Sequence, residues 1–485
     1  MSLHTVEKIA FDFSSSRPLE IEVSDSPLSS DAGLLPIAQF DEQIGLTAAF
    51  ASAIVDRRDS LYVRHSLASM VKQRIFGIIA DYEDQNDHDT LRSDPVFKLI
   101  AGRLPTEPHL ASQPTLSRFE NDVSIGDLWR LRDCLVDQFI SSFKSPPRQI
   151  TLDVDAFDDP AHGQQQLTFF HGHYGSNQYL PIVFTCAEND AVVLVGLRHG
   201  TCGAALGADD DVRLLVRRLR CAWPDVTIYL RGDCGFGVPA MYDACEELDV
   251  FYTFGVGMNK RVKALSHSLL ELAMAEYQKT GEPQRLFDRA EYQADSWPHS
   301  RQIVVKAEAN AMGVNRRAVV TNRPGWEISP QAIYDSYAER GESENRNKEL
   351  KCDLQADRLS DHRFIANYFR LYLHATALNL LVRLRQAIAR PSPTPNDLGL
   401  STAIPASALD EPSRRQFFNR RRMWDPLGSG CASTWRTRLI KVAAEVVTRA
   451  RRVIIRLSAT WPHLQTFQDV SQAILGQKSA RRGAG

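Results

Sequence analysis

The spacing of apolar residues between about residues 148 and 256 constrains the fold of this chain more than any other feature. Near Arg148 a helical spacing gives way to a period of two residues with many β-branched side chains. The pattern predicts five strands and two helices in the order Gln149–Phe157, Tyr179–Cys186, Ala191–Leu197, helix Asp210–Ala222, Val226–Arg231, helix Pro239–Glu247 and Val250–Val256. This order predicts an α/β fold in which helices flank a mixed sheet.

The patterns on either side of these strands divide the chain into three regions. Helical apolar spacing from Gln43 to Asp81 predicts a helical N-terminal region at 1–145, followed by the α/β region at 146–390. Within the α/β region, about 258–325 has a different composition and is interpreted as a β-rich insertion. Its expected strands lie around Arg285–Glu291, Arg301–Ala307 and Arg317–Thr321.

The chain is expected to become helical again from about Pro330 to Ala389. A proline-rich linker (Pro391, Pro393 and Pro395) then begins a basic helical C-terminal region at 391–485, whose last helix is expected at Thr434–Leu457. Residues 340–485 hold 25 Lys and Arg against 12 Asp and Glu, whereas the whole chain has a net charge of −2. Such a region is either a surface for a polyanion or an ordinary solvated helical face.

Composition excludes several classes of protein. The 485 residues are 43% apolar and 24% charged, as in folded soluble proteins, and are too many for one hydrophobic core. The longest apolar stretches, such as Val192–Val195, are far shorter than the roughly 18 residues of a membrane span. The eight cysteines form no C-x-x-C pair, which argues against a disulfide framework and a structural zinc site. We therefore expect a cytoplasmic protein.

One short segment of the N-terminal region has the pattern of a recognition helix. Gln113–Glu120 carries a proline near its start, then short polar residues and Arg118. This pattern suits a helix that meets DNA with its N-terminal turn, which makes Arg118 a candidate DNA contact. A plain connector helix is the alternative.

Two acidic residues share one face of the first expected strand. Alternate strand residues point the same way, so Asp153 and Asp155 lie opposite Leu152, Val154 and Ala156. Carboxylates in an apolar strand are costly to bury unless they bind a cation or another partner. Alternatively, the strand ends here and the acids lie in a turn.

A third aspartate follows a later strand. Asp233 comes directly after the apolar run Ile228–Leu230 and Arg231-Gly232, at the carboxyl end of the expected strand. Open α/β sheets bind their ligands at this end of their strands. The alternative is an aspartate that caps the following helix.

A stripe of basic residues surrounds one glutamate in the expected helix after Pro330. On a helix, the side chains of this stripe lie within about 40° of a line that runs along the helix surface through Glu344. They are Tyr337, Arg340, Lys348 and Lys351. The pattern suits a metal-bound carboxylate beside cations that hold phosphates, or else a surface helix with ordinary ion pairs.

Taken together, the acids predict an oxygen-only site for two Mg²⁺ ions. A carboxylate from the first strand, one from a later strand end and one from a helix are the ligands that Mg²⁺ prefers. Two such ions stabilise the attacking and leaving oxygens of phosphoryl transfer. The chain has no G-x-x-x-x-G-K-[ST] loop, so the substrate suggested by the basic C-terminal region is nucleic acid rather than a nucleotide.

The spacing Tyr337-x₂-Arg340-x₃-Glu344-x₆-Lys351 resembles the signature of bacterial insertion-sequence transposases of the DDE superfamily. The segment Leu152–Asp155, followed by Asp158-Asp159-Pro160-x-His162-Gly163, most resembles the thirteen-eighty group of these elements. The resemblance implies an RNase H-like catalytic domain and a metal-binding triad of Asp155, Asp233 and Glu344, with Asp153 as the alternative first acid.

The resemblance also implies the roles of the remaining residues. Tyr337, Arg340, Lys348 and Lys351 would contact DNA phosphates. Trp297 in the insertion would stack on a flipped base, although a tryptophan at this position also suits a core.

The activity implied is metal-dependent cleavage and strand transfer at the element ends, with two Mg²⁺ ions per site and Mn²⁺ as a substitute. The implied partners are double-stranded DNA and a second copy of the chain, with no membrane. The alternatives are a nuclease of the same fold without strand transfer and a non-catalytic DNA-binding protein derived from a transposase.

Overall fold

The computed structural model describes residues 9–11, 19–21, 23, 25–389, 411–425, 427–428 and 430–482. The proline-rich linker after residue 390 lies outside the described residues. None of the described helices is long and apolar enough to cross a membrane.

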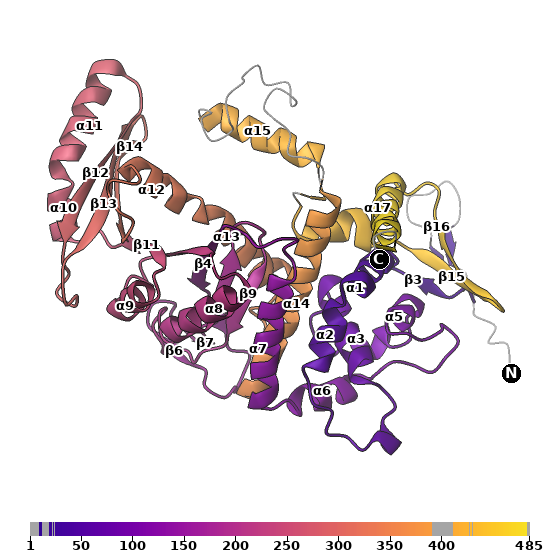
Figure 1. The fold of residues 1–485 in the computed structure, drawn as a ribbon. Helices are drawn as coiled ribbons and strands as arrows, with labels where there is room; N and C mark the ends of the chain where they lie inside the picture. The colour runs from indigo at the N-terminus through magenta and orange to yellow at the C-terminus, as the bar shows by residue number, and fades with distance from the viewer. Residues whose placement is uncertain are drawn as a thin grey trace.

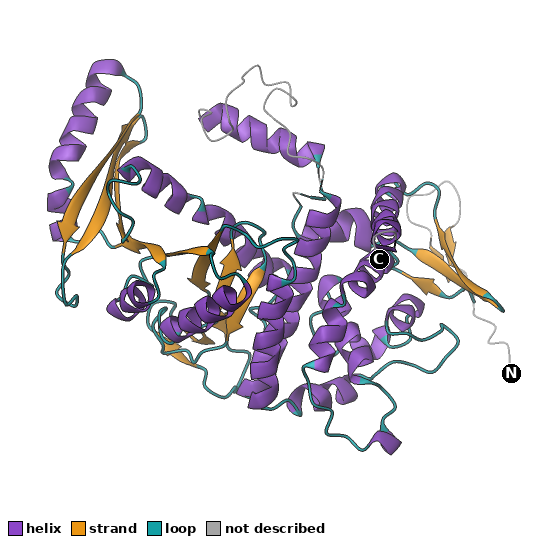
Figure 2. Ribbon diagram, viewed as in Figure 1, coloured by secondary structure: helices purple, strands orange, loops and turns teal. Residues whose placement is uncertain are grey.

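An eight-stranded mixed sheet runs from β12–β14, at the left end of the molecule in the view shown, to β4 and β9 near its middle (Figures 1 and 2). Its order is β12-β13-β14-β11-β10-β4-β8-β9, and β10 is parallel to β4 and β11 while the other neighbours are antiparallel. The strands are β4 (Gln149–Ala156), β8 (Ile182–Cys186), β9 (Val192–Gly196), β10 (Thr227–Gly232), β11 (Phe251–Val256), β12 (Gln284–Tyr292), β13 (Arg301–Asn310) and β14 (Gly313–Thr321). The expected mixed sheet flanked by helices is confirmed.

Two groups of helices border this sheet. Helices α8 (Ala208–Ala222) and α9 (Pro239–Glu247) pack on each other, and α9 also contacts β11. At the edge strand β9, α7 (Ile125–Ile140) and α14 (Phe364–Ile388) contact the sheet, and α7 also contacts α8. Most of the 25 residues of α14 are buried, because the helix runs between the sheet and the N-terminal helices (Figure 1). A helix that is apolar on nearly all sides is expected in such a position.

After three short strands, the N-terminal region is helical from Leu34 to Ile140, and this stretch includes the segment from Gln43 for which helical spacing was noted. Its elements are α1 (Leu34–Ile44), α2 (Leu46–Ser52), η1 (Ser60–Tyr62), α3 (Leu67–Ile79), α4 (His88–Leu91), α5 (Pro95–Ile100) and α6 (Gln113–Asn121), followed by α7. Side-chain caps start several of them. Asp94 accepts from the Val96 and Phe97 backbone, and Ser124 and Asp127 form a capping box at the start of α7.

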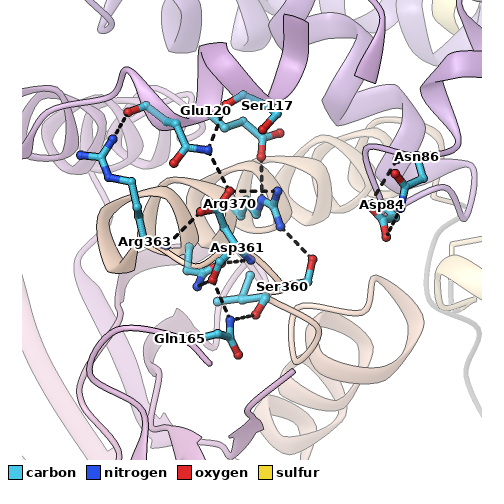
Figure 3. A network of polar contacts seen from close by, with 12 residues as sticks. Asp84, Asn86, Ser117, Glu120, Gln165, Ser360, Asp361, Arg363 and Arg370 are labelled. Atoms are coloured by element: carbon cyan, nitrogen blue, oxygen red, sulfur yellow. Dashed lines mark hydrogen bonds and ion pairs between the residues drawn. The ribbon is translucent and has the colours of Figure 1, made fainter. Parts of the chain in front are cut away.

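A buried ionic network joins α6 to α14 (Figure 3). Glu120 of α6 is fully buried between Arg74 of α3 and Arg370 of α14, and each arginine Nε lies 2.6 Å from a carboxylate oxygen. Asp361, just before α14, lies 3.5 Å from the Arg370 guanidinium. The helix expected to recognise DNA is therefore fixed to the helix that packs on the central sheet.

The β-rich insertion contains helices in addition to its expected strands. It begins with two helices, α10 (Lys260–Leu265) and α11 (His267–Thr280), and α11 packs on β12 and β13. The three expected strands are present as β12, β13 and β14. They extend the central sheet, because β14 pairs with β11 along its edge. The β-branched pattern predicted the strands, whereas the weak amphipathicity of 260–280 concealed the helices.

In the C-terminal region, the prediction of a helix at Thr434–Leu457 is wrong. The chain forms α16 (Ala432–Trp435), a π-helical turn (Arg436–Ile440) and then a hairpin of β15 (Ala444–Arg449) and β16 (Arg452–Leu457). In β15, Ala444 and Val446 are buried while the alternate residues are less so, a period of two rather than 3.6. The C-terminal region also contains α15 (Glu411–Trp424) and α17 (Leu464–Arg482). Near the N-terminus lie the short strands β1 (Ile9–Phe11), β2 (Leu19–Ile21) and β3 (Leu28–Ser29), and β3 pairs with β15.

Candidate active site

Asp153, the first acid in β4, forms a buried ion pair. The register of the parallel strands β4 and β10 places Asp153 beside Arg231. Arg231 donates from Nε to Asp153 Oδ1 over 2.7 Å and from Nη2 to Oδ2 over 2.8 Å. The two side chains are 1% and 5% exposed. Because one guanidinium occupies both carboxylate oxygens, this geometry favours Asp155 over Asp153 as the acid available to a ligand.

Asp155 and Asp233 lie side by side at the ends of these same strands. Val154 pairs with Gly232, so the residues that follow them, Asp155 and Asp233, continue the register on neighbouring strands, which are about 4.8 Å apart. Burial raises the pKa of Asp155, and the Asp233 carboxylate raises it further, whereas Arg340 lowers it. The sheet therefore holds two carboxylates close together, an arrangement that favours a bound cation.

Glu344 lies on a helix that packs against β4 and the neighbouring strand β8. α12 (Pro330–Ala338) leads into α13 (Arg340–Lys348), which contacts β4 and β8, and a hydrogen bond of 2.8 Å joins Ser343 to Thr185 of β8. Arg340 donates to Asp155 over 3.4 Å and to Glu344 one turn further along α13. One guanidinium thus links the strand acid to the helix acid.

The basic stripe spans three short elements rather than one helix. Tyr337 belongs to α12, Arg340 and Lys348 to α13, and Lys351 to a π-helical turn at Glu349–Asp353. Lys348 is exposed, and Lys351 lies 2.5 Å from Asp158, which follows β4. A Cβ at Gly255 would lie 2.9 Å from the Tyr337 hydroxyl, so the glycine permits the close approach of Tyr337 to the Asp233 backbone. Burial raises the pKa of Tyr337.

Two residues of the site were missed by sequence reasoning. Asn347, 8% exposed, donates to Asp155 Oδ2 over 3.1 Å. Arg231 also donates to the Ser336 carbonyl of α12, so it ties the strand to the segment that carries Tyr337. For Asn347 the available signal was its position three residues after Glu344. For Arg231 it was a cation in an otherwise apolar strand.

Two other expected contacts lie away from the acids. Trp297 is 7% exposed and packs against Tyr242, Tyr292 and Arg301 in the core beneath β13. Arg118 is exposed on α6, and it lines a groove together with residues of the loop after α2, including Arg57 and Arg58.

The side chains of the candidate site are chemically suited to bind a hard cation. Among the residues that the structure describes, no three His, Cys, Asp or Glu side chains lie close enough together to hold a metal ion. Asp155, Asp233 and Glu344 nevertheless provide only oxygen donors, and the buried Oδ1 of Asn347 has no hydrogen-bond partner. Glu344 is 57% exposed, so its side chain has room to turn toward the two aspartates.

Comparison with known proteins identifies the family of the chain. The family model described as "Transposase DDE domain group 1" matches residues 11–395. Among solved structures, the chain is similar to piggyBac transposase in a cryo-EM synaptic complex with hairpin DNA, at 12% identity and a TM-score of 0.37, over 93% of this chain and 88% of that chain. No curated protein matches. The family match covers far more than half of the sequence, and the chain therefore belongs to the transposase DDE domain group 1 family.

Proposed function

We propose that this protein cuts DNA at the ends of its own insertion sequence and joins the freed 3′ ends to a target. The observation that carries the proposal is the pair of strand-end carboxylates, Asp155 and Asp233, linked through Arg340 to Glu344. Mg²⁺, or Mn²⁺ in its place, would be held by these three acids as two ions, and when bound it stabilises charge on the attacking and leaving oxygens. The motif at Leu152–Gly163 supports assignment to the thirteen-eighty group of bacterial elements.

The basic residues of the site are proposed to bind the DNA backbone. Arg340 is 12% exposed, and although burial opposes its charge, Asp155, Tyr337 and Glu344 raise its pKa, so it stays cationic. Lys351 and Lys348 follow it along the chain, and Asp158 orients Lys351. Arginine and lysine side chains donate hydrogen bonds to phosphate oxygens, and such contacts do not distinguish among the four bases. They would therefore position the DNA for cleavage through its sugar–phosphate backbone.

The proposal extends to the partners of the protein. Double-stranded DNA is the substrate, and two copies of the chain act together because two element ends must be joined in one event. Arg118 on the exposed side of α6 is proposed to contact DNA outside the catalytic site. We assign Trp297 a packing role, because its neighbours cover the ring.

The test is cleavage of a labelled duplex that carries the element end, with its sequence taken from the DNA flanking the gene. We expect nicking at one position with Mg²⁺ or Mn²⁺ and none in their absence. A duplex of the same length with a scrambled end sequence is the control and should stay intact. Binding without cutting under either metal would instead support a non-catalytic DNA-binding protein.

A further inference from the structure

The hairpin of β15 and β16 carries a cluster of arginines at its tip. The two strands are joined by the two-residue turn Ala450-Arg451, and Arg449 and Arg452 lie directly opposite each other where the turn begins and ends. Arg449, Arg451 and Arg452, here called the arginine tip, are all exposed. Within the part of the chain that the structure describes, none of the three forms an ion pair. The arginine tip is therefore a concentrated and uncompensated positive charge.

The base of the hairpin, in contrast, is fixed to the body of the molecule. β15 pairs with β3, and the buried Val446 donates its backbone N–H to the Pro27 carbonyl over 2.8 Å. Ile455 of β16 packs against the core that the N-terminal helices share. Glu445, the one acidic residue of the two strands, lies at this base and pairs with Arg456 over 2.9 Å. The fold thus holds the hairpin in place while its tip stays free of acidic partners.

The arrangement of the arginines does not stabilise the hairpin itself. Side chains directly opposite each other on antiparallel strands have Cβ atoms about 5 Å apart, and like charges at such positions destabilise the strand pair. A bound polyanion would offset the repulsion between Arg449 and Arg452. A second copy of the same hairpin would increase it. β16 is also the edge strand of the order β16-β15-β3, and charged side chains on an edge oppose pairing with a further strand.

We propose that the arginine tip binds the phosphate backbone of duplex DNA outside the catalytic site. The hairpin lies at the right end of the molecule in Figure 1, whereas β4 lies near the middle, so the two would contact different parts of one duplex. Arginine donates two parallel hydrogen bonds to phosphate, and a two-stranded ribbon is narrow enough to enter the major groove. This inference rests on the proposed function and adds a second DNA-binding surface to it.

The test measures DNA binding by the full-length protein in the Glu344→Gln background with Mg²⁺, in which binding is separated from cutting. The tip variant combines Arg449→Gln, Arg451→Gln and Arg452→Gln. Its affinity for a labelled duplex with the element end should fall at least about 10-fold at about 100 mM salt. The slope of log affinity against log salt should become shallower by about 2 to 3, because each phosphate contact contributes about 0.9.

Two further measurements separate binding from folding and from sequence recognition. A scrambled duplex of the same length should show the same change in slope, because phosphate contacts carry no sequence information. The melting temperature of the tip variant should not fall, because glutamine removes the repulsion between Arg449 and Arg452.

The matched control removes three exposed positive charges from α10 and α11, at the opposite end of the molecule (Figure 1). It combines Lys260→Gln, Lys263→Gln and Lys279→Gln and should keep the original salt slope. An unchanged slope in the tip variant, or an equal change in the control, would overturn the inference. An altered oligomeric state in light scattering, with the slope unchanged, would assign the tip to contact between subunits.

The outcome for the inference is separable from that for the proposed function. The tip variant in the otherwise wild-type protein retains all three acids, so at low salt and saturating DNA it should cut at the wild-type rate. Failure of the wild-type protein to cut under Mg²⁺ or Mn²⁺ would overturn the proposed function, and the salt slopes would still decide whether the arginine tip binds DNA.

Discussion

Replacing Asp155 or Asp233 by asparagine should reduce DNA cleavage roughly a thousandfold while DNA binding stays within about threefold of the wild type. The substitution keeps the size of the side chain and removes one of two neighbouring carboxylates. A positioned metal ion contributes several kcal/mol to phosphoryl transfer, and each 1.36 kcal/mol corresponds to about tenfold in rate. Binding should persist because the substitution removes a negative charge that faces a polyanion. Rates from single-turnover cleavage and affinities from titration of a labelled duplex measure the two effects separately.

Asp210→Asn is the control for these variants. Asp210 is 86% exposed on α8, and its contact with Arg213 is 4.0 Å long. The Asp210→Asn variant should cleave DNA at the same rate as the wild type. Cleavage that survives in Asp155→Asn and Asp233→Asn would show that the strand-end acids are not the active site.

Replacing Glu120 by glutamine should lower the free energy of unfolding by about 3 to 5 kcal/mol. Glu120 is fully buried, and Arg74 and Arg370 each donate to it over 2.6 Å. The amide keeps the shape of the side chain but removes the carboxylate that pairs with Arg74 and leaves Arg370 only its longer contact with Asp361, which is the costly way to break a buried ion pair. Urea titration followed by circular dichroism at neutral pH measures the difference.

The effect should depend on pH in a defined direction. Burial would raise the pKa of Glu120, but Arg74 and Arg370 outweigh it and hold the pKa below its ordinary value of 4.5. The stabilisation is therefore present above pH 4.5 and is lost as the pH falls through the lowered folded-state pKa. The difference between wild type and Glu120→Gln should shrink over that range.

Glu276→Gln is the surface control. Glu276 pairs with Lys279 at 3.9 Å, and the two side chains are 41% and 75% exposed, so the change should be within about 0.5 kcal/mol. If Glu120→Gln were equally mild, the network in Figure 3 would not be what fixes α6 to α14.

The strands could be predicted, and the acids proposed for the site could be singled out, because their signals are local. β4 and β10 were found from period-two spacing, and Glu344 from its spacing to Tyr337 and Arg340. The choice between Asp153 and Asp155 could not be made from the local sequence. It depends on the register of β10 against β4, which places Arg231 beside Asp153, and no pattern within one strand carries that information.

The remaining features could not be predicted for similar reasons. The β15–β16 hairpin was expected to be helical because its charged and β-branched residues also fit a helical face over short stretches. Asn347 contacts Asp155 only because α13 crosses β4, and Trp297 is enclosed only because Tyr242 and Tyr292 fold around it. Each depends on contacts between segments that lie far apart in the sequence.

The most direct test of the account is the joining of precut element ends to a target plasmid. A labelled duplex with a free 3′-hydroxyl is incubated with the protein, Mg²⁺ and supercoiled plasmid, and the label is followed into plasmid-sized DNA. The account predicts joined products with the wild type and none with Asp155→Asn. Metal-dependent cutting of the intact end duplex without any joining, under Mg²⁺ or Mn²⁺, would contradict it and identify a nuclease of the same fold.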